Sequence, residues 1–323
     1  MISREIVKRT LNFDRPERVA HSFEPSDFVF GGPEIPNPLD KWHKVDERQW
    51  QRTDEWGNIW GRVDDTSKGQ IIHGILENLS EIPTFPLPDF ANAAHYTHAK
   101  ETFAQQPDKW HVGRVQGFTF KMAQQLRRFD QYLIDLVMEP HRISQLHDRI
   151  DEQILWQIKR LQQTGADSIM FWEDWGTQAQ TFISPKLWRT EFKPRFMNLV
   201  AEAHALGLSV IMHSCGKITS ILPDLIECGV DVFQFDQPRI HGIDTLSELQ
   251  QGHVTYWCPV DIQTTLQSQD ETLIRQEAGG LIKKLWRGQG GFIAGFYEDE
   301  ASIGLETHWQ QIACEEYLRQ GTK

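Results

Sequence analysis

From residue 111 onward, short apolar stretches of strand length alternate with longer segments of helical pattern. The apolar stretches are HVGRVQGF, DSIMFWED, LSVIMHSC, DVFQFD, VTYWCPVD and GFIAGFYED, and the helical segments include LWRTEFKPRFMNLVAEAHALG, ITSILPDLIECG and DETLIRQEAGGLIKKLWRGQG. Ser184-Pro185 marks the start of one helix, and Gly207 and Gly229 mark the ends of others. Strands that alternate with helices predict a parallel sheet, and near-continuous apolar strands indicate that helices cover its outer face.

The first 110 residues are rich in Pro and Trp, with turn-like stretches such as FGGPEIPNPLD and IPTFPLPD. We expect a helix over residues 3–12, a strand over Arg18–Phe23, and then irregular covering segments. With this strand about seven strands are predicted, and an eighth is expected in the Trp-rich region. The fold prediction is an α/β (β/α)8 TIM barrel, irregular near its N-terminus, with residues 1–323 as one domain. A doubly wound open sheet is the alternative, although no Gly-rich phosphate loop follows the first strand.

The formal net charge of −12 argues against nucleic acid or an anionic membrane as a partner, because both need a basic surface. The four cysteines form no CxxC pair, so reduced thiols are expected. No secretory signal and no run of about 20 apolar residues is visible. A cytoplasmic protein that acts on a small molecule is the expectation.

Barrel active sites form where the strands end at their carboxyl side. Nearly every predicted strand is followed there by a polar or metal-capable group. In chain order these groups are Glu24, Gln116, Glu173, Asp174, His213, Cys215, Asp236, Cys258, Asp261, Tyr297, Glu298 and Asp299. Their convergence predicts an active site at this end of the barrel.

The most specific feature is His213-Ser-Cys215-Gly at the end of one strand. On an extended strand, residues i and i+2 point the same way, so one imidazole and one thiolate can share an ion. Nitrogen and sulfur ligands suit zinc. The alternative is a packed histidine beside an inert thiol.

A third metal ligand is needed, and the sequence offers several. Cys258 ends another strand and is the natural sulfur candidate, whereas Glu298 and Asp299 are oxygen candidates. Cys228 and Cys314 lie in helical segments and are expected to pack as small apolar residues.

Glu173 and Asp174 are adjacent acids directly after an apolar strand. Because neighbours on an extended chain face opposite ways, at most one of them is expected to reach the cavity as an acid, base or substrate anchor. Helix capping or a surface turn is the alternative. Trp172, Trp175 and Trp257 would form a flat apolar wall for a ring-bearing ligand, or else pack within the barrel.

Two long stretches, FWEDWGTQAQTFISPKLWRTEFKPRF and GLSVIMHSCGKITSILPDLIECGVDVFQFDQP, resemble the uroporphyrinogen decarboxylase superfamily. SREIVKRTLNFDRPERV and DEWGNIWGRVD resemble its branch of zinc-dependent, corrinoid-linked methyltransferases. This resemblance covers nearly the whole chain and implies a (β/α)8 barrel.

The chain departs from the family pattern in two places. True decarboxylases carry an arginine-rich motif after the first strand, whereas HSFEPSDFVFGG here has no arginine. The methyltransferase branch adds a later Cys at the last strand, whereas IAGFYEDEASIG has none. By this resemblance His213 and Cys215 carry over as metal ligands, and the third does not. Either Cys258 or an acid of Tyr297–Asp299 replaces it, or zinc binds weakly or not at all.

The resemblance implies a zinc-dependent methyltransferase that works with a corrinoid protein or a small methyl donor. Glu173 or Asp174 would orient the substrate, and Tyr297 would donate a hydrogen bond. The other residues expected to bind substrate are Glu24, Gln116, Trp172, Asp236, Trp257 and Asp299. The alternatives are a lyase acting on a carboxylated ring compound and a non-catalytic barrel that binds a ligand or a corrinoid protein.

Overall fold

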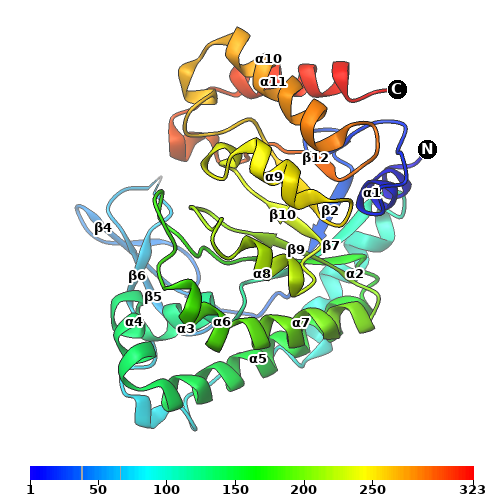
Figure 1. Cartoon of the computed structure of the whole chain (residues 1–323). Coiled ribbons are helices and arrows are strands. Elements are labelled where there is room, and N and C mark those ends of the chain that lie inside the picture. The colour runs from blue at the N-terminus through cyan, green and yellow to red at the C-terminus, as the bar shows by residue number, and fades with distance from the viewer. Residues whose placement is uncertain (38, 66) are drawn as a thin grey trace.

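Eight parallel strands curve into a nearly closed barrel in the computed structural model of the chain, which describes residues 1–37, 39–65 and 67–323 (Figure 1). The strand order is β1-β12-β11-β10-β9-β8-β7-β2. The strands are β1 Ala20–His21, β2 Phe28–Gly31, β7 Trp110–Val115, β8 Ser168–Trp172, β9 Ser209–His213, β10 Val232–Gln234, β11 Thr255–Cys258 and β12 Phe292–Ala294. The TIM-barrel prediction is therefore confirmed, and the open-sheet alternative is wrong.

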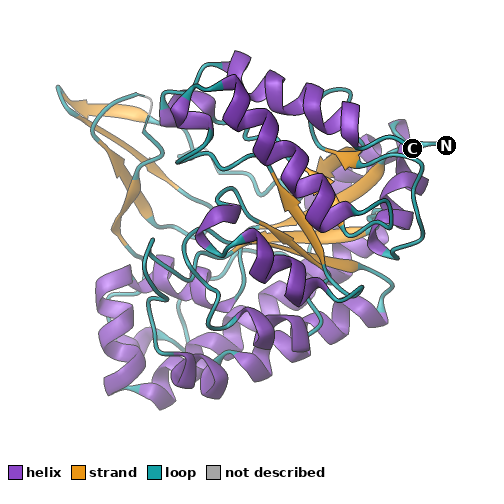
Figure 2. Ribbon diagram, turned by 45° about the horizontal axis from the view of Figure 1, so that its top comes forward, coloured by secondary structure: helices purple, strands orange, loops and turns teal. Residues whose placement is uncertain are grey.

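Helices surround the strands on the outside of the barrel (Figure 2). They are α1 Ser3–Leu11, α2 Thr97–Gln105, α3 Thr119–Arg127, α4 Phe129–Met138, α5 Pro140–Gln163, α6 Pro185–Glu191, α7 Lys193–Ala205, α8 Leu222–Glu227, α9 Ile243–Gln250, α10 Glu271–Leu281 and α11 Thr307–Gln320. A π-helical turn, Ile282–Trp286, extends α10. None of the described helices is both long and apolar enough to cross a membrane.

Local signals explain where several helices begin and end. The Ser184 side chain accepts the Leu187 N–H at 3.2 Å and caps α6, as expected for a Ser-Pro start. The segment predicted as one helix over 187–207 is divided into α6 and α7, because Pro194 in the first turn of α7 has no N–H to donate to the preceding turn.

The apolar core has two parts on either side of the barrel wall. Side chains inside the barrel include Val112, Met170, Ile211, Val232 and Ile293. A larger cluster fills the space between the strands and the helices. Successive side chains along each strand point alternately into the barrel and toward the helices. Whether a residue occupies an odd or an even position of its strand, its strand parity, therefore decides whether it can reach the barrel mouth.

The Trp-rich N-terminal region differs from the expectation of irregular segments. It forms an antiparallel sheet of strands β3 His43–Asp46, β4 Gln49–Thr53, β5 Ile59–Arg62 and β6 Gln70–His73, which we call the small sheet. Arginine and tryptophan side chains stack on one another there: Arg52 lies over Trp60 at 4.9 Å, and Arg62 lies over Trp42 at 4.4 Å. The eighth barrel strand, β2, does lie within the first 110 residues, as expected, and it precedes the small sheet.

The small sheet projects from the barrel on the side opposite the chain termini (Figures 1 and 2). The indole of Trp56, between β4 and β5, donates to Gln116 just after β7 at 2.6 Å. Lys68, between β5 and β6, pairs with Asp299 at 3.2 Å and donates to the Tyr297 hydroxyl at 3.3 Å, beyond β12. The small sheet thus contacts both sides of the mouth formed by the carboxyl ends of the strands.

Candidate metal centre at the barrel mouth

Three metal-capable side chains meet where β8 and β9 end. His213 is the last residue of β9, Cys215 follows two residues later, and Asp174 lies two residues beyond β8. The Cys215 Sγ lies 3.4 Å from His213 Nε2, and that nitrogen lies 3.7 Å from Asp174 Oδ1. One ligand atom from each of the three lies within 4.8 Å of the others. We call this group the Asp-His-Cys cluster.

A hydrogen-bonded relay sets the orientation of the histidine. Gln234, on β10, donates from Nε2 to Asp236 Oδ1 at 2.7 Å. Its Oε1 therefore faces His213 Nδ1 and accepts the proton there. In the neutral imidazole this leaves the Nε2 lone pair directed at Cys215 and Asp174, as in histidines that bind metal.

The loops that carry Asp174 and Cys215 are held together by backbone N–H groups of the second loop, which donate to a side chain and a carbonyl of the first. The Cys215 N–H donates to Asp174 Oδ1 at 2.7 Å, and the Lys217 N–H donates to the Thr177 carbonyl at 2.7 Å. Gly216 has φ +78°, and a Cβ there would lie 2.0 Å from the Gly176 carbonyl oxygen. Only glycine fits this approach, so the contact between the two loops depends on the glycine at this position.

Ionisation of the Cys215 thiol would require a bound cation. Burial, followed by the carboxylates of Asp174 and Asp236, raises the pKa of the Cys215 thiol. Without a cation the thiol therefore stays protonated at neutral pH, and a metal ion would both release this proton and offset the carboxylate charge.

The ligand spacing also fits zinc. Zinc–sulfur bonds of about 2.3 Å and zinc–nitrogen or zinc–oxygen bonds of about 2.0–2.2 Å place tetrahedral ligand atoms roughly 3.4–3.6 Å apart. The Cys215–His213 separation of 3.4 Å lies within this range, and the His213–Asp174 separation of 3.7 Å is slightly longer. Three protein ligands would leave one position for substrate, which is the arrangement of catalytic rather than structural zinc sites.

The structure does not bring Cys258 to this cluster. On β11, Trp257 faces the inside of the barrel, and Cys258 lies in the outer cluster, fully buried. Burial raises the pKa of its thiol. On strand parity Cys258 faces away from this cluster, and Asp174 lies where a third ligand could bind.

Glu173 also differs from the expectation of a catalytic group. Its side chain is fully buried and accepts the N–H groups of Phe120 and Lys121, at 2.7 Å and 3.1 Å, in the first turn of α3. Burial raises the pKa of Glu173 to about 8. The adjacent acids do face opposite ways: Asp174 reaches the mouth, and Glu173 caps a helix behind the barrel wall.

The remaining predicted residues lie around the mouth in different settings. Trp172 is half-buried and packs against the apolar cluster inside the barrel, which makes it an accessible part of the wall. Trp257 is buried, stacks on Phe28 with ring centroids 4.6 Å apart, and donates to Ser22 at 3.3 Å. Trp175 packs outside the barrel between rings of the helix layer.

Other predicted residues at the rim contact the loops or the small-sheet region. Gln116, Tyr297 and Asp299 contact Trp56 or Lys68 of the small-sheet region. Glu24 accepts the Ser26 N–H at 3.3 Å, and it lines a hollow of about 360 Å³ that Glu298 and Cys314 also line. Asp261 accepts backbone N–H groups of its own turn.

Sequence reasoning missed Gln234 and Lys68. Gln234 could have been found from DVFQFD, because a glutamine two residues before Asp236 shares its face of the strand. Nothing in the local sequence predicts that Lys68 meets Tyr297, since that contact joins segments 229 residues apart.

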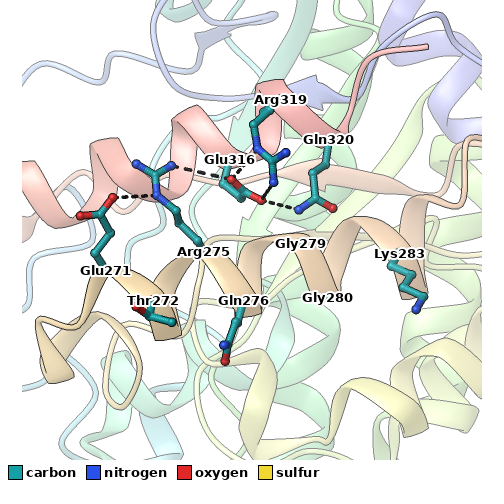
Figure 3. A pocket seen from close by; sticks show the side chains of 10 residues that line it. All are labelled: Glu271, Thr272, Arg275, Gln276, Gly279, Gly280, Lys283, Glu316, Arg319 and Gln320. Atoms are coloured by element: carbon teal, nitrogen blue, oxygen red, sulfur yellow. Dashed lines mark hydrogen bonds and ion pairs between the residues drawn. The ribbon is translucent and has the colours of Figure 1, made fainter.

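A separate cleft of about 570 Å³ lies between α10 and α11 (Figure 3). Four of the charged groups that line it form ion pairs with one another: Arg275 with Glu271 at 2.8 Å, and Arg319 with Glu316 at 2.5 Å. These helices pack outside the barrel, so we place the functional site at the mouth rather than in this cleft.

The fold and the site together define a (β/α)8 barrel whose mouth gathers metal-capable side chains. The family model for uroporphyrinogen decarboxylase (URO-D) matches residues 87–296, and the chain belongs to this family. No curated protein matches the sequence significantly.

Among solved structures, the chain is similar to a methyltransferase from Methanosarcina mazei, with a TM-score of 0.62 at 14% identity over 78% of this chain and 72% of that one. A D-psicose 3-epimerase from Clostridium cellulolyticum H10 matches with a TM-score of 0.44 at 9% identity, over 75% of this chain and 86% of that one. The first likeness shows the barrel fold, and the second is too weak to support an argument.

Proposed function

We propose that the chain is a zinc-dependent methyltransferase that works with a corrinoid protein or a small methyl donor. The observation that carries this proposal is the Asp-His-Cys cluster at the mouth of a URO-D family barrel. The fold it shares with a protein described as a methyltransferase supports the same reading. We propose Asp174, His213 and Cys215 as the zinc ligands.

Zinc held there would supply Lewis acidity, which keeps an acceptor thiol as thiolate or polarises a methoxy or methylamine group. The protein groups around it have distinct tasks in this proposal. Gln234 holds the His213 tautomer, and Asp236 holds Gln234 in turn. Trp172 offers an apolar surface for the substrate body, and the small sheet limits access of water to the mouth.

A reconstituted assay tests this function. The zinc-loaded chain is mixed with free methylcobalamin and a panel of small thiols, and transfer is followed from the absorbance change of the corrinoid. We expect transfer with the wild type and with Cys258→Ser, and loss of transfer with His213→Ala. If the wild type transfers no faster than free zinc with every thiol, the proposed function is wrong.

A further inference from the structure

An arginine points into the barrel from β7. Residues alternate along this strand: Trp110 and Val112 belong to the cluster inside the barrel, whereas a Cβ on Gly113 would lie 3.0 Å from Leu161 of α5. Arg114 therefore shares the inward face with Val112. Its guanidinium lies over the ring of Phe30, on the neighbouring strand β2, at 4.9 Å.

Arg114 has no charged or hydrogen-bonding partner among the residues that the structure describes. Across residues 1–37, 39–65 and 67–323, its side chain makes no ion pair and no hydrogen bond, and the residue is exposed although it lies in the barrel wall. Inward positions of such barrels are usually filled by apolar side chains. Stacking on Phe30 holds the guanidinium in place and leaves its five N–H donors free, in a chain with a net charge of −12.

The strand register places this arginine close to the Asp-His-Cys cluster. Arg114 pairs with Met170 on β8, and Trp172, two residues further along β8, pairs with His213. His213 lies two strands across the sheet from Arg114 and two residues further along it. These displacements put the Cα atoms of the two residues about 12 Å apart. Trp172 lies between them, so a molecule with one ring and a short substituent would span the gap.

We propose that Arg114 is the anion-binding subsite of this active site and that the substrate is a small organic carboxylate. The carboxylate of the substrate binds the Arg114 guanidinium. The planar body of the substrate lies on Trp172, and its reacting end lies at the Asp-His-Cys cluster. Guanidinium groups bind carboxylates through two parallel hydrogen bonds, which fixes orientation as well as affinity. This proposal rests on the proposed function only for the chemistry at the far end.

The test is a calorimetric titration of the zinc-loaded chain with benzoate and phenylacetate, each against its neutral amide. We expect both acids to bind the wild type at least about tenfold more tightly than their amides, because a hydrogen bond to a charged partner is lost with the amide. Arg114→Met should remove this preference and Arg114→Lys should keep part of it. Arg142→Met, which changes an exposed arginine of α5, should leave the preference unchanged.

Equal binding of acids and amides by the wild type, no binding of either acid, or an unchanged acid preference in Arg114→Met would each overturn the proposal. Zinc content is measured on the same samples. Because Arg114 is not a ligand of the cluster, Arg114→Met should hold as much zinc as the wild type. A wild type without zinc that still selects the acids would contradict the proposed function and leave the anion subsite standing.

Discussion

Two regions meet at the barrel mouth: the wall, meaning the loops that carry Asp174 and Cys215, and the small sheet. Different kinds of contact hold them in place. The loops of the wall are fixed by contacts of the backbone, such as the Cys215 N–H that donates to the Asp174 carboxylate and the close approach of Gly216 to the Gly176 carbonyl. The small sheet is held by side chains, through Arg–Trp stacking, Trp56 to Gln116, and Lys68 to Asp299.

The family match includes the wall but not the small sheet. It covers residues 87–296, which include the Asp-His-Cys cluster, whereas the small sheet lies before that range. Backbone-fixed geometry suits metal ligands, which need sub-ångström placement, and side-chain contacts suit a part that shapes access. We therefore expect changes in the wall to alter metal binding and changes at the small sheet to alter substrate affinity.

The largest expected effect is that of Gly216→Ala. A Cβ would lie 2.0 Å from the Gly176 carbonyl oxygen, so the two loops must separate. We expect the free energy of unfolding to fall by about 3 kcal/mol and metal content to fall with it. Gly207→Ala is the matched control, since Gly207 has the same φ of +78° with nothing within 4 Å of its Cβ position. It should cost about 1 kcal/mol with metal retained; equal effects of the two variants would contradict the steric account.

Gln234→Leu should weaken zinc binding by about 10- to 100-fold, because the proton on His213 Nδ1 loses its acceptor. The measurement is competition with a chelator of known affinity. Gln116→Leu, which breaks only the contact with Trp56 of the small-sheet region, is expected to bind zinc as the wild type does. If the two variants lose zinc equally, the division between wall and small sheet is wrong.

Glu173→Gln tests whether the buried Glu173 side chain, which caps α3, makes stability depend on pH. The folded-state pKa of Glu173 is raised from 4.5 to about 8, so its contribution to stability is full below the unfolded pKa and is lost as pH rises through about 8. Between these values we expect wild-type stability to fall by up to about 1.4 kcal/mol per pH unit from this group. Denaturant unfolding at pH 5 and pH 8 should show a smaller fall in Glu173→Gln, whereas Glu152→Gln, at an exposed position of α5, should behave as the wild type. An identical fall in all three would contradict this role.

The smallest effect is expected for Lys68→Met, which removes the ion pair with Asp299 at the rim. Surface pairs contribute at most about 1 kcal/mol, so substrate affinity should change by less than about fivefold and zinc content should not change. Steady-state KM is compared with that of Lys44→Met, an exposed residue of β3. Loss of zinc in Lys68→Met would show that the small sheet does help to hold the metal.

The sequence predicts the wall far better than the small sheet. Apolar stretches and helix-end signals locate the strands after residue 111, and the i, i+2 spacing of His213 and Cys215 already places both side chains on one face. The third ligand could not be read in the same way. Cys258 ends one strand and Asp174 follows another, and only the strand parity and the path of the loop decide which one faces the mouth.

The small sheet was not predicted because its stability comes from contacts between strands. Arg52 and Trp60 stack across neighbouring strands, and neither residue shows this in its local sequence. The Pro-rich stretches around it favour turns and conceal four short strands. Arg114 could not be predicted as a binding residue either, because only the tertiary structure shows which charged groups lie near an arginine on a strand.

Zinc content, combined with zinc-edge X-ray absorption, tests the central claim most directly. It is measured on the wild type, Asp174→Ala, His213→Ala, Cys215→Ala and Cys258→Ala. We expect about one zinc per wild-type chain, with sulfur, imidazole and carboxylate ligands, loss of zinc in the first three variants and full retention in Cys258→Ala. Loss of zinc in Cys258→Ala, or equally negligible zinc in the wild type and His213→Ala, would contradict a metal centre built from Asp174, His213 and Cys215.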